Sequence, residues 1–156
     1  MRRLLPTLVA MAVLWLWTAT ASAQTTPIQQ RLANAASLTC RFTLLTTGTW
    51  KDGVPGADVK PATFTLTFTD IDAGDGTARA TGNYGASSVV VRYVNDYLHL
   101  MQIFGAGPLY TTTVFARETK EGRLMAVHTR HEYVDVILPG FTSRPEMYLG
   151  ECTLGA

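Results

Sequence analysis

The chain has 156 residues, with 13 basic and 12 acidic side chains and a formal net charge of +1. A nearly neutral chain offers no electrostatic footprint to a phosphate backbone, so the composition argues against nucleic acid as a partner. The two cysteines and an apolar N-terminal run are the features that bear on destination and fold.

The first 23 residues have the three parts of a signal peptide. Two arginines precede an apolar run, Leu8 to Trp17, which leads into the small-residue site Ala21-Ser22-Ala23. This pattern is typical of a cleaved export signal. The run is shorter than the roughly 20 apolar residues of a membrane span, so an uncleaved anchor is the less favoured alternative. We expect cleavage near Ala23, a periplasmic or secreted location, and no transmembrane segment in the mature chain.

Residues 24–37 differ in composition from the rest of the chain. Thr26-Pro27 has the pattern of a helix N-cap followed by proline in the first turn. The sequence predicts a short N-terminal helix or arm over 24–37.

From Leu38 onward the hydrophobic period is two, which is typical of half-buried strands. Turn signals recur about every ten residues and bound eight predicted strands. These cover residues 38–47, 61–69, 77–84, 87–94, 97–104, 109–117, 123–134 and 146–154. No helical pattern separates them, which predicts antiparallel hairpins in a barrel or a sandwich.

The cysteines favour the barrel. An exported chain reaches an oxidising compartment, where Cys40 and Cys152 are expected to form a disulfide. In an up-and-down barrel the first and last strands pair, so this bridge would lie at the closure seam. We therefore predict an all-β, eight-stranded antiparallel up-and-down barrel over residues 38–156. A sandwich remains the alternative, and short strands without a terminal aromatic disfavour an outer-membrane barrel.

The stretch Met125 to Val136 contains two histidines, an arginine and two carboxylates. On a strand, His128 and His131 point to opposite sides, so no shared metal is expected there. The acidic segment Asp70 to Asp75 is interpreted as a hairpin connection, because it lacks the closing glutamate of a calcium loop. No cofactor is predicted, and an enzyme is the less favoured hypothesis, with His131, Tyr110 and Arg130 as its candidate group.

The turn near Thr119-Lys120-Glu121-Gly122 joins two predicted strands whose inner face must be chosen. We predict that Tyr110, Thr112, Val114 and Ala116 of the first strand face the interior. On the second strand, one face carries arginine and the other does not, and we predict that the set of residues without arginine faces inward. That set is Met125, Val127, Thr129 and His131.

Gly48-Thr49-Trp50 resembles the Gly-x-Trp motif of lipocalins and their calycin relatives. Separately, the whole chain is similar to exported bacterial proteins, which implies no function. The resemblance to lipocalins implies a lipocalin-like barrel, with Gly48 and Trp50 at its floor and a small apolar molecule in the cup above.

The expected function is therefore binding of a small apolar ligand inside the barrel. The predicted lining residues are Phe64, Leu66, Phe68, Met101, Tyr110, Val114, Met125, Val127 and His131. The alternative is a protein-binding or enzyme-inhibitor module, resembling the small exported inhibitors of proteases and lysozymes. It would act through the segments 24–36, 51–61 and 139–145.

Overall fold

The computed structural model describes residues 25–82, 85–134 and 143–155. The predicted signal peptide and residues 139–142 of one predicted binding loop lie outside these ranges. The described chain forms one helix and eight strands in the order α1 Pro27–Ala33, β1 Leu38–Lys51, β2 Val54–Asp72, β3 Thr77–Gly82, β4 Gly85–Val94, β5 Tyr97–Ile103, β6 Leu109–Glu118, β7 Leu124–His131 and β8 Glu146–Leu154.

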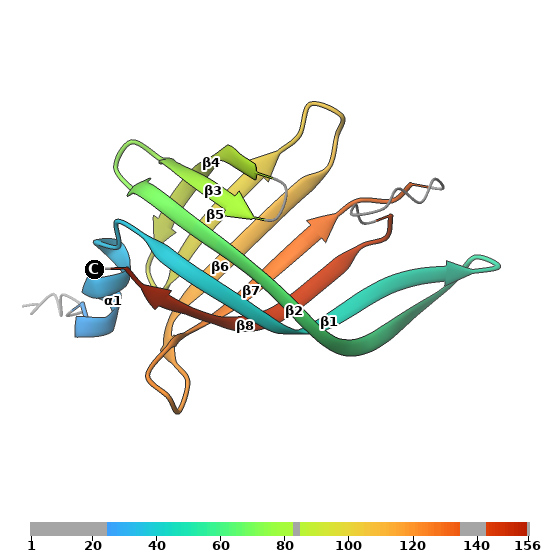
Figure 1. Ribbon diagram of the computed structural model, residues 1–156, viewed down its shortest axis with the longest axis horizontal. Helices are drawn as coiled ribbons and strands as arrows, with labels where there is room; N and C mark the ends of the chain where they lie inside the picture. Colours follow the sequence, from blue (N-terminus) through green and yellow to red (C-terminus); the bar gives the residue numbers. More distant parts are fainter. Residues whose placement is uncertain (1–24, 83–84, 135–142, 156) are drawn as a thin grey trace, which may run out of the picture.

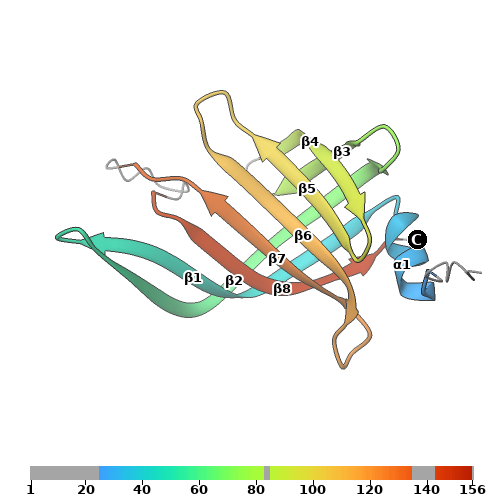
Figure 2. The ribbon, with the colours of Figure 1, turned by 180° about the vertical axis from the view of Figure 1, so that it is seen from behind.

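Each strand pairs antiparallel with the next, and β8 pairs with β1, so the sheet closes into a barrel. The predicted all-β, eight-stranded up-and-down barrel is confirmed. Cys40 and Cys152 lie directly opposite each other on β1 and β8, and their disulfide joins the seam as predicted. Figures 1 and 2 show the seam strands β1 and β8 side by side from both directions.

Helix α1 packs against one end of the barrel, next to the C-terminus (Figure 1). The predicted N-cap is present, because the Thr26 hydroxyl accepts a hydrogen bond from the Gln29 backbone. Leu32 is fully buried. The Tyr93 hydroxyl donates to the Gln29 carbonyl, and Arg31 forms an ion pair with Glu118. The helix therefore covers this end of the barrel instead of forming a loose arm. No helix in the described ranges is both long and apolar enough to cross a bilayer.

The opposite end, here called the mouth, is dominated by the hairpin of β1 and β2, which projects beyond the other strands (Figure 1). Asp52 and Gly53 form its turn, with φ of 52° and 78°. Two consecutive positive φ values are the signature of a tight type I′ hairpin turn. The prediction of a loop over residues 51–61 is wrong. The turn takes up only two residues, so β1 continues to Lys51 and β2 begins at Val54.

The predicted inner face of β7 is also wrong. Tyr110 pairs with Arg130 and Thr112 with His128, so even-numbered residues oppose even-numbered residues. Opposed residues share a face of the sheet, and a one-residue change of register exchanges the faces. The interior therefore receives His128 and Arg130, together with Leu124 and Ala126. The predicted inner residues Met125, Val127, Thr129 and His131 lie on the outer face.

Below the mouth the barrel is filled by side chains. The fully buried members of this core come from β1, β2 and β4 to β8, and include Phe42, Phe68, Val91, Leu98, Leu100 and Val114. An eight-stranded barrel is just wide enough for side chains to fill it. Any ligand site inside the barrel must therefore lie above this layer, toward the mouth.

Candidate ligand-binding site at the barrel mouth

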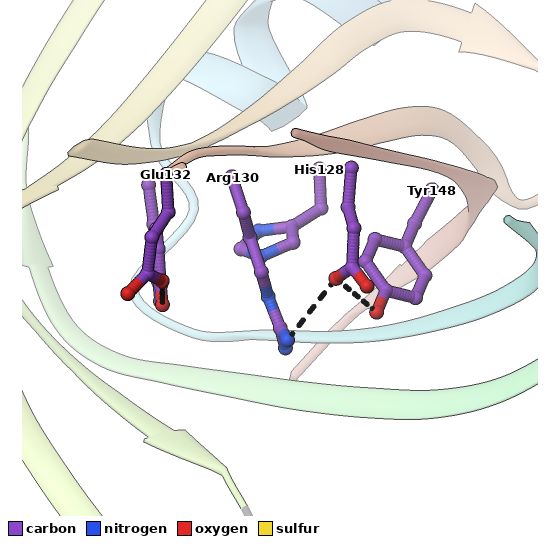
Figure 3. A network of polar contacts seen from close by, with 6 residues as sticks. His128, Arg130, Glu132 and Tyr148 are labelled. Atoms are coloured by element: carbon purple, nitrogen blue, oxygen red, sulfur yellow. Dashed lines mark hydrogen bonds and ion pairs between the residues drawn. The ribbon is translucent and has the colours of Figure 1, made fainter. Parts of the chain in front are cut away.

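Above the core, polar and aromatic side chains from four strands and the segment after β7 meet in one group, here called the mouth cluster. It consists of Phe64 of β2, Tyr110 of β6, His128 and Arg130 of β7, Glu132, and Glu146 and Tyr148 of β8. Strand alternation places them together, because residues two apart on β7 and on β8 share a face. Figure 3 shows the polar contacts of the cluster from close by, with His128, Arg130, Glu132 and Tyr148 labelled.

Arg130 lies at the centre of the cluster. Its guanidinium carbon is 4.6 Å from the ring centre of Phe64, 5.1 Å from that of Tyr148 and 5.3 Å from that of Tyr110. Its Nη1 is 3.4 Å from Oε2 of Glu146, and the two side chains are only 12% and 13% exposed. Cation–π contacts and a carboxylate thus compensate a charge that burial would otherwise destabilise.

His128 connects Arg130 to the core. The side chain is 4% exposed, with Nδ1 2.9 Å from the Thr112 hydroxyl and Nε2 accepting a hydrogen bond from Nε of Arg130 at 3.3 Å. Burial, and then the charge of Arg130, lower the pKa of His128 to about 3. The ring is therefore neutral near pH 7, and because Nε2 is an acceptor, the proton resides on Nδ1.

Two tyrosines donate hydrogen bonds to the carboxylates of the cluster. The Tyr148 hydroxyl donates to Glu146 at 2.7 Å, and the Tyr110 hydroxyl donates to Glu132 at 2.7 Å. Burial, followed by the bond to Glu132, raises the pKa of Tyr110 to about 12. Burial and the bond to Glu146 also raise the pKa of Tyr148. Both hydroxyls therefore stay protonated and can serve as donors rather than as bases.

A pocket of about 300 Å³ adjoins this cluster, at the base of the β1–β2 hairpin. It is lined by Leu45, Lys60, Pro61, Ala62, Thr63, Phe64, Arg130 and Tyr148. Its volume is at the lower end of the range for small-molecule sites, and apolar walls with a few polar groups are typical of such sites. Leu45 and Lys60 are directly opposed, so the hairpin presents both on the same inward face.

The residues predicted to line a ligand cavity have three different positions. Phe64 lines the mouth pocket, and Tyr110 contacts Arg130 nearby. Leu66, Phe68 and Val114 face inward, but Phe68 and Val114 belong to the filled core. Met101, Met125, Val127 and His131 point outward: Met101 lies between inward Leu100 and Gln102, and the β7 register turns the other three away.

Two further hypotheses depended on positions that the structure corrects. Tyr110 and Arg130 are inside the barrel, whereas His131 is outside and contacts Thr129, so the three members of the candidate catalytic group do not meet. Trp50 is 49% exposed on the projecting hairpin, where its ring packs 5.6 Å from that of Tyr133. It does not close a floor, a position that α1 occupies. Among the residues with described positions, no three His, Cys, Asp or Glu side chains gather as a metal site would require.

A second concavity, of about 580 Å³, lies outside the barrel between α1 and the end of β8. Its wall combines the polar residues Gln30, Arg31 and Asn34 with Pro27, Ala35, Ala36, Leu154 and Gly155, and no aromatic ring lines it.

Comparisons of the chain with protein-family models, with curated proteins and with solved structures find no match. The resemblance to lipocalins stays a prediction.

Proposed function

We propose that this protein binds a small, mainly apolar molecule in the mouth pocket. The observation that carries the proposal is the pocket itself, a space of about 300 Å³ with Leu45, Ala62 and Phe64 in its walls. Apolar walls above a filled core suit a compact ligand that covers them, since removing apolar surface from water is favourable by about 25 cal/mol per Å². The packed layer below keeps the ligand near the mouth.

The mouth pocket is also preorganised in the absence of ligand. Arg130 is fixed by three aromatic rings, Glu146 and His128, so its position does not have to be ordered on binding. A fixed wall reduces the entropy that a ligand must offset. Binding should therefore change the strands of the cluster little.

Titration with octan-1-ol, followed by NMR amide shifts, tests this proposal. We expect saturable shifts at Leu45, Ala62 and Phe64. The variant Ala62→Phe fills the pocket and should abolish them. Its matched control is Ala57→Phe, an exposed alanine on the same hairpin that does not line the pocket. No saturable shift in the wild-type protein, or equal binding by both variants, would contradict the proposal.

A protein partner is the second candidate, and the projecting hairpin favours it. Val54 and Val59 are 66% and 63% exposed there, which leaves apolar surface beyond the barrel. Native mass spectrometry of protein purified from its producing cell separates the candidates. A retained small molecule supports ligand binding, whereas a co-purified protein that is lost on Val59→Lys supports an interface on the hairpin.

A further inference from the structure

We infer that the molecule held in the mouth pocket is an apolar monoanion, an aliphatic carboxylate in the simplest case, whose acid group lies between Lys60 and Arg130. This inference rests on the proposed function and adds the charge of the ligand to it. It is carried by the side chains that line the pocket and by their existing partners.

The lining contains two cationic side chains, Lys60 and Arg130, and no carboxylate. Lys60 is exposed, and within the described ranges it forms no ion pair. Its neighbour on the strand face, Asp58, does not line the pocket. The β1–β2 hairpin therefore presents an ammonium group without an ion-pair partner in the described ranges, at the edge of a wall that also contains the apolar residues Leu45, Ala62 and Phe64.

Arg130 is compensated only in part. Its hydrogen bonds to His128 and Glu146 use Nε and Nη1, and among the residues with described positions no acceptor bonds to Nη2. The contact with Glu146 is 3.4 Å, longer than the 2.7–2.9 Å of a strong charge-assisted hydrogen bond. A ligand carboxylate can thus accept from Nη2 without displacing Glu146, and it can also accept from the Tyr148 hydroxyl if that group turns from Glu146.

The charged members of the pocket lining determine the sign of the ligand's charge. Lys60 and Arg130 are both cationic, whereas the carboxylates of Glu132 and Glu146, which lie outside the lining, contact Tyr110, Tyr148 and Arg130. One acid group placed between the two cations can interact with both, so a monoanion is the simplest ligand. A cationic ligand would meet both Lys60 and Arg130 at close range, although aromatic rings surround the site, because Arg130 already occupies the space between those rings.

Calorimetric titration with octanoate, octan-1-ol and octyltrimethylammonium tests the inference on one aliphatic chain with three head groups. We expect octanoate to bind at least about tenfold more tightly than octan-1-ol, as a hydrogen-bonded charge pair implies. The cation should bind most weakly. Added salt should weaken octanoate binding and leave octan-1-ol binding nearly unchanged.

The variants assign the effect to Lys60, since changing Arg130 would perturb the fold. Lys60→Met should reduce the preference for octanoate to about threefold or less, and Lys60→Arg should restore it. Lys51→Met removes the same charge near the hairpin tip, outside the pocket lining, and should keep the wild-type preference.

The outcomes separate this inference from the proposed function. Equal affinity for octanoate and octan-1-ol, a preference for the cation, or an unchanged preference in Lys60→Met would overturn the inference while the pocket remains a binding site. Absence of binding by all three compounds would overturn both. The expected preference, lost in Lys60→Met and kept in Lys51→Met, supports both.

Discussion

Replacing Arg130 by methionine should strongly destabilise the protein. The change leaves Glu146, whose side chain is 13% exposed, without its cationic partner. Removing one member of a buried ion pair typically costs about 3–5 kcal/mol. The lost contacts with the rings of Phe64, Tyr110 and Tyr148 act in the same direction, while the methionine recovers part of the packing.

A matched control is Arg123, the residue just before β7. Arg123 forms an ion pair with Glu151 at 2.9 Å, but these side chains are 42% and 22% exposed. This pair is more exposed than the pair of Arg130 and Glu146, and a solvent-exposed ion pair contributes about 1 kcal/mol or less, so Arg123→Met should cost less than Arg130→Met. Urea unfolding under non-reducing conditions, with equal m-values in the variants, gives the two differences in the free energy of unfolding.

A double-mutant cycle distinguishes charge from packing. Glu146→Gln in the Arg130→Met background removes the uncompensated carboxylate and should recover part of the lost stability. Equal costs for Arg130→Met and Arg123→Met, or no recovery in the double variant, would refute a buried Arg130–Glu146 ion pair at the mouth.

Three further predictions concern the disulfide, the buried histidine and the helix. Replacing both Cys40 and Cys152 by serine removes a bridge between residues 112 apart and should lower the free energy of unfolding by about 4–5 kcal/mol in urea titrations. The pKa of His128 falls from 6.5 to about 3 on folding, so in this window the unfolded chain binds a proton that the folded chain does not. Stability should therefore decrease with falling pH, by up to about 1.4 kcal/mol per pH unit from this group. In urea titrations the stability advantage of the wild type over His128→Gln should shrink from neutral to mildly acidic pH, and a constant advantage would contradict this reading. Leu32→Ala should lower the free energy of unfolding by about 2–5 kcal/mol in thermal or urea unfolding, because the Leu32 side chain of α1 is fully buried against the barrel. A loss below about 1 kcal/mol would show that the helix is not part of the fold.

Sequence reasoning reached the barrel because the signals it used are local or covalent. Alternation of apolar residues and threonines marks strands, turn residues separate them, and the cysteine pair indicates which strands close the sheet. The N-cap of α1 was equally readable, since Thr26 and Pro27 act within one helical turn.

The site could not be predicted because it depends on register and on side-chain compensation. The β6–β7 connection places Glu118 opposite Leu124, and a one-residue difference there exchanges every inner and outer residue of β7. The prediction also assumed that arginine would avoid the interior. Arg130 is inside because rings from β2, β6 and β8 and the carboxylate of Glu146 meet around it, and these residues are distant in the sequence.

The length of the β1–β2 hairpin could not be predicted from the sequence either. Prolines and glycines in Lys51 to Pro61 are typical of a loop, yet Asp52 and Gly53 alone make the turn. The remaining residues pair along the projecting strands and bring Lys60 opposite Leu45. Two pocket residues therefore come from a segment whose composition does not indicate a strand.

Intermolecular NOEs between octanoate and the protein give the most direct test of the mouth pocket as the binding site. The structure predicts contacts from the aliphatic protons of the ligand to the rings of Phe64 and Tyr148 and to the methyl groups of Leu45. Contacts confined to Ala35 and Leu154 in the groove beside α1, or no intermolecular contacts at saturating ligand, would contradict it.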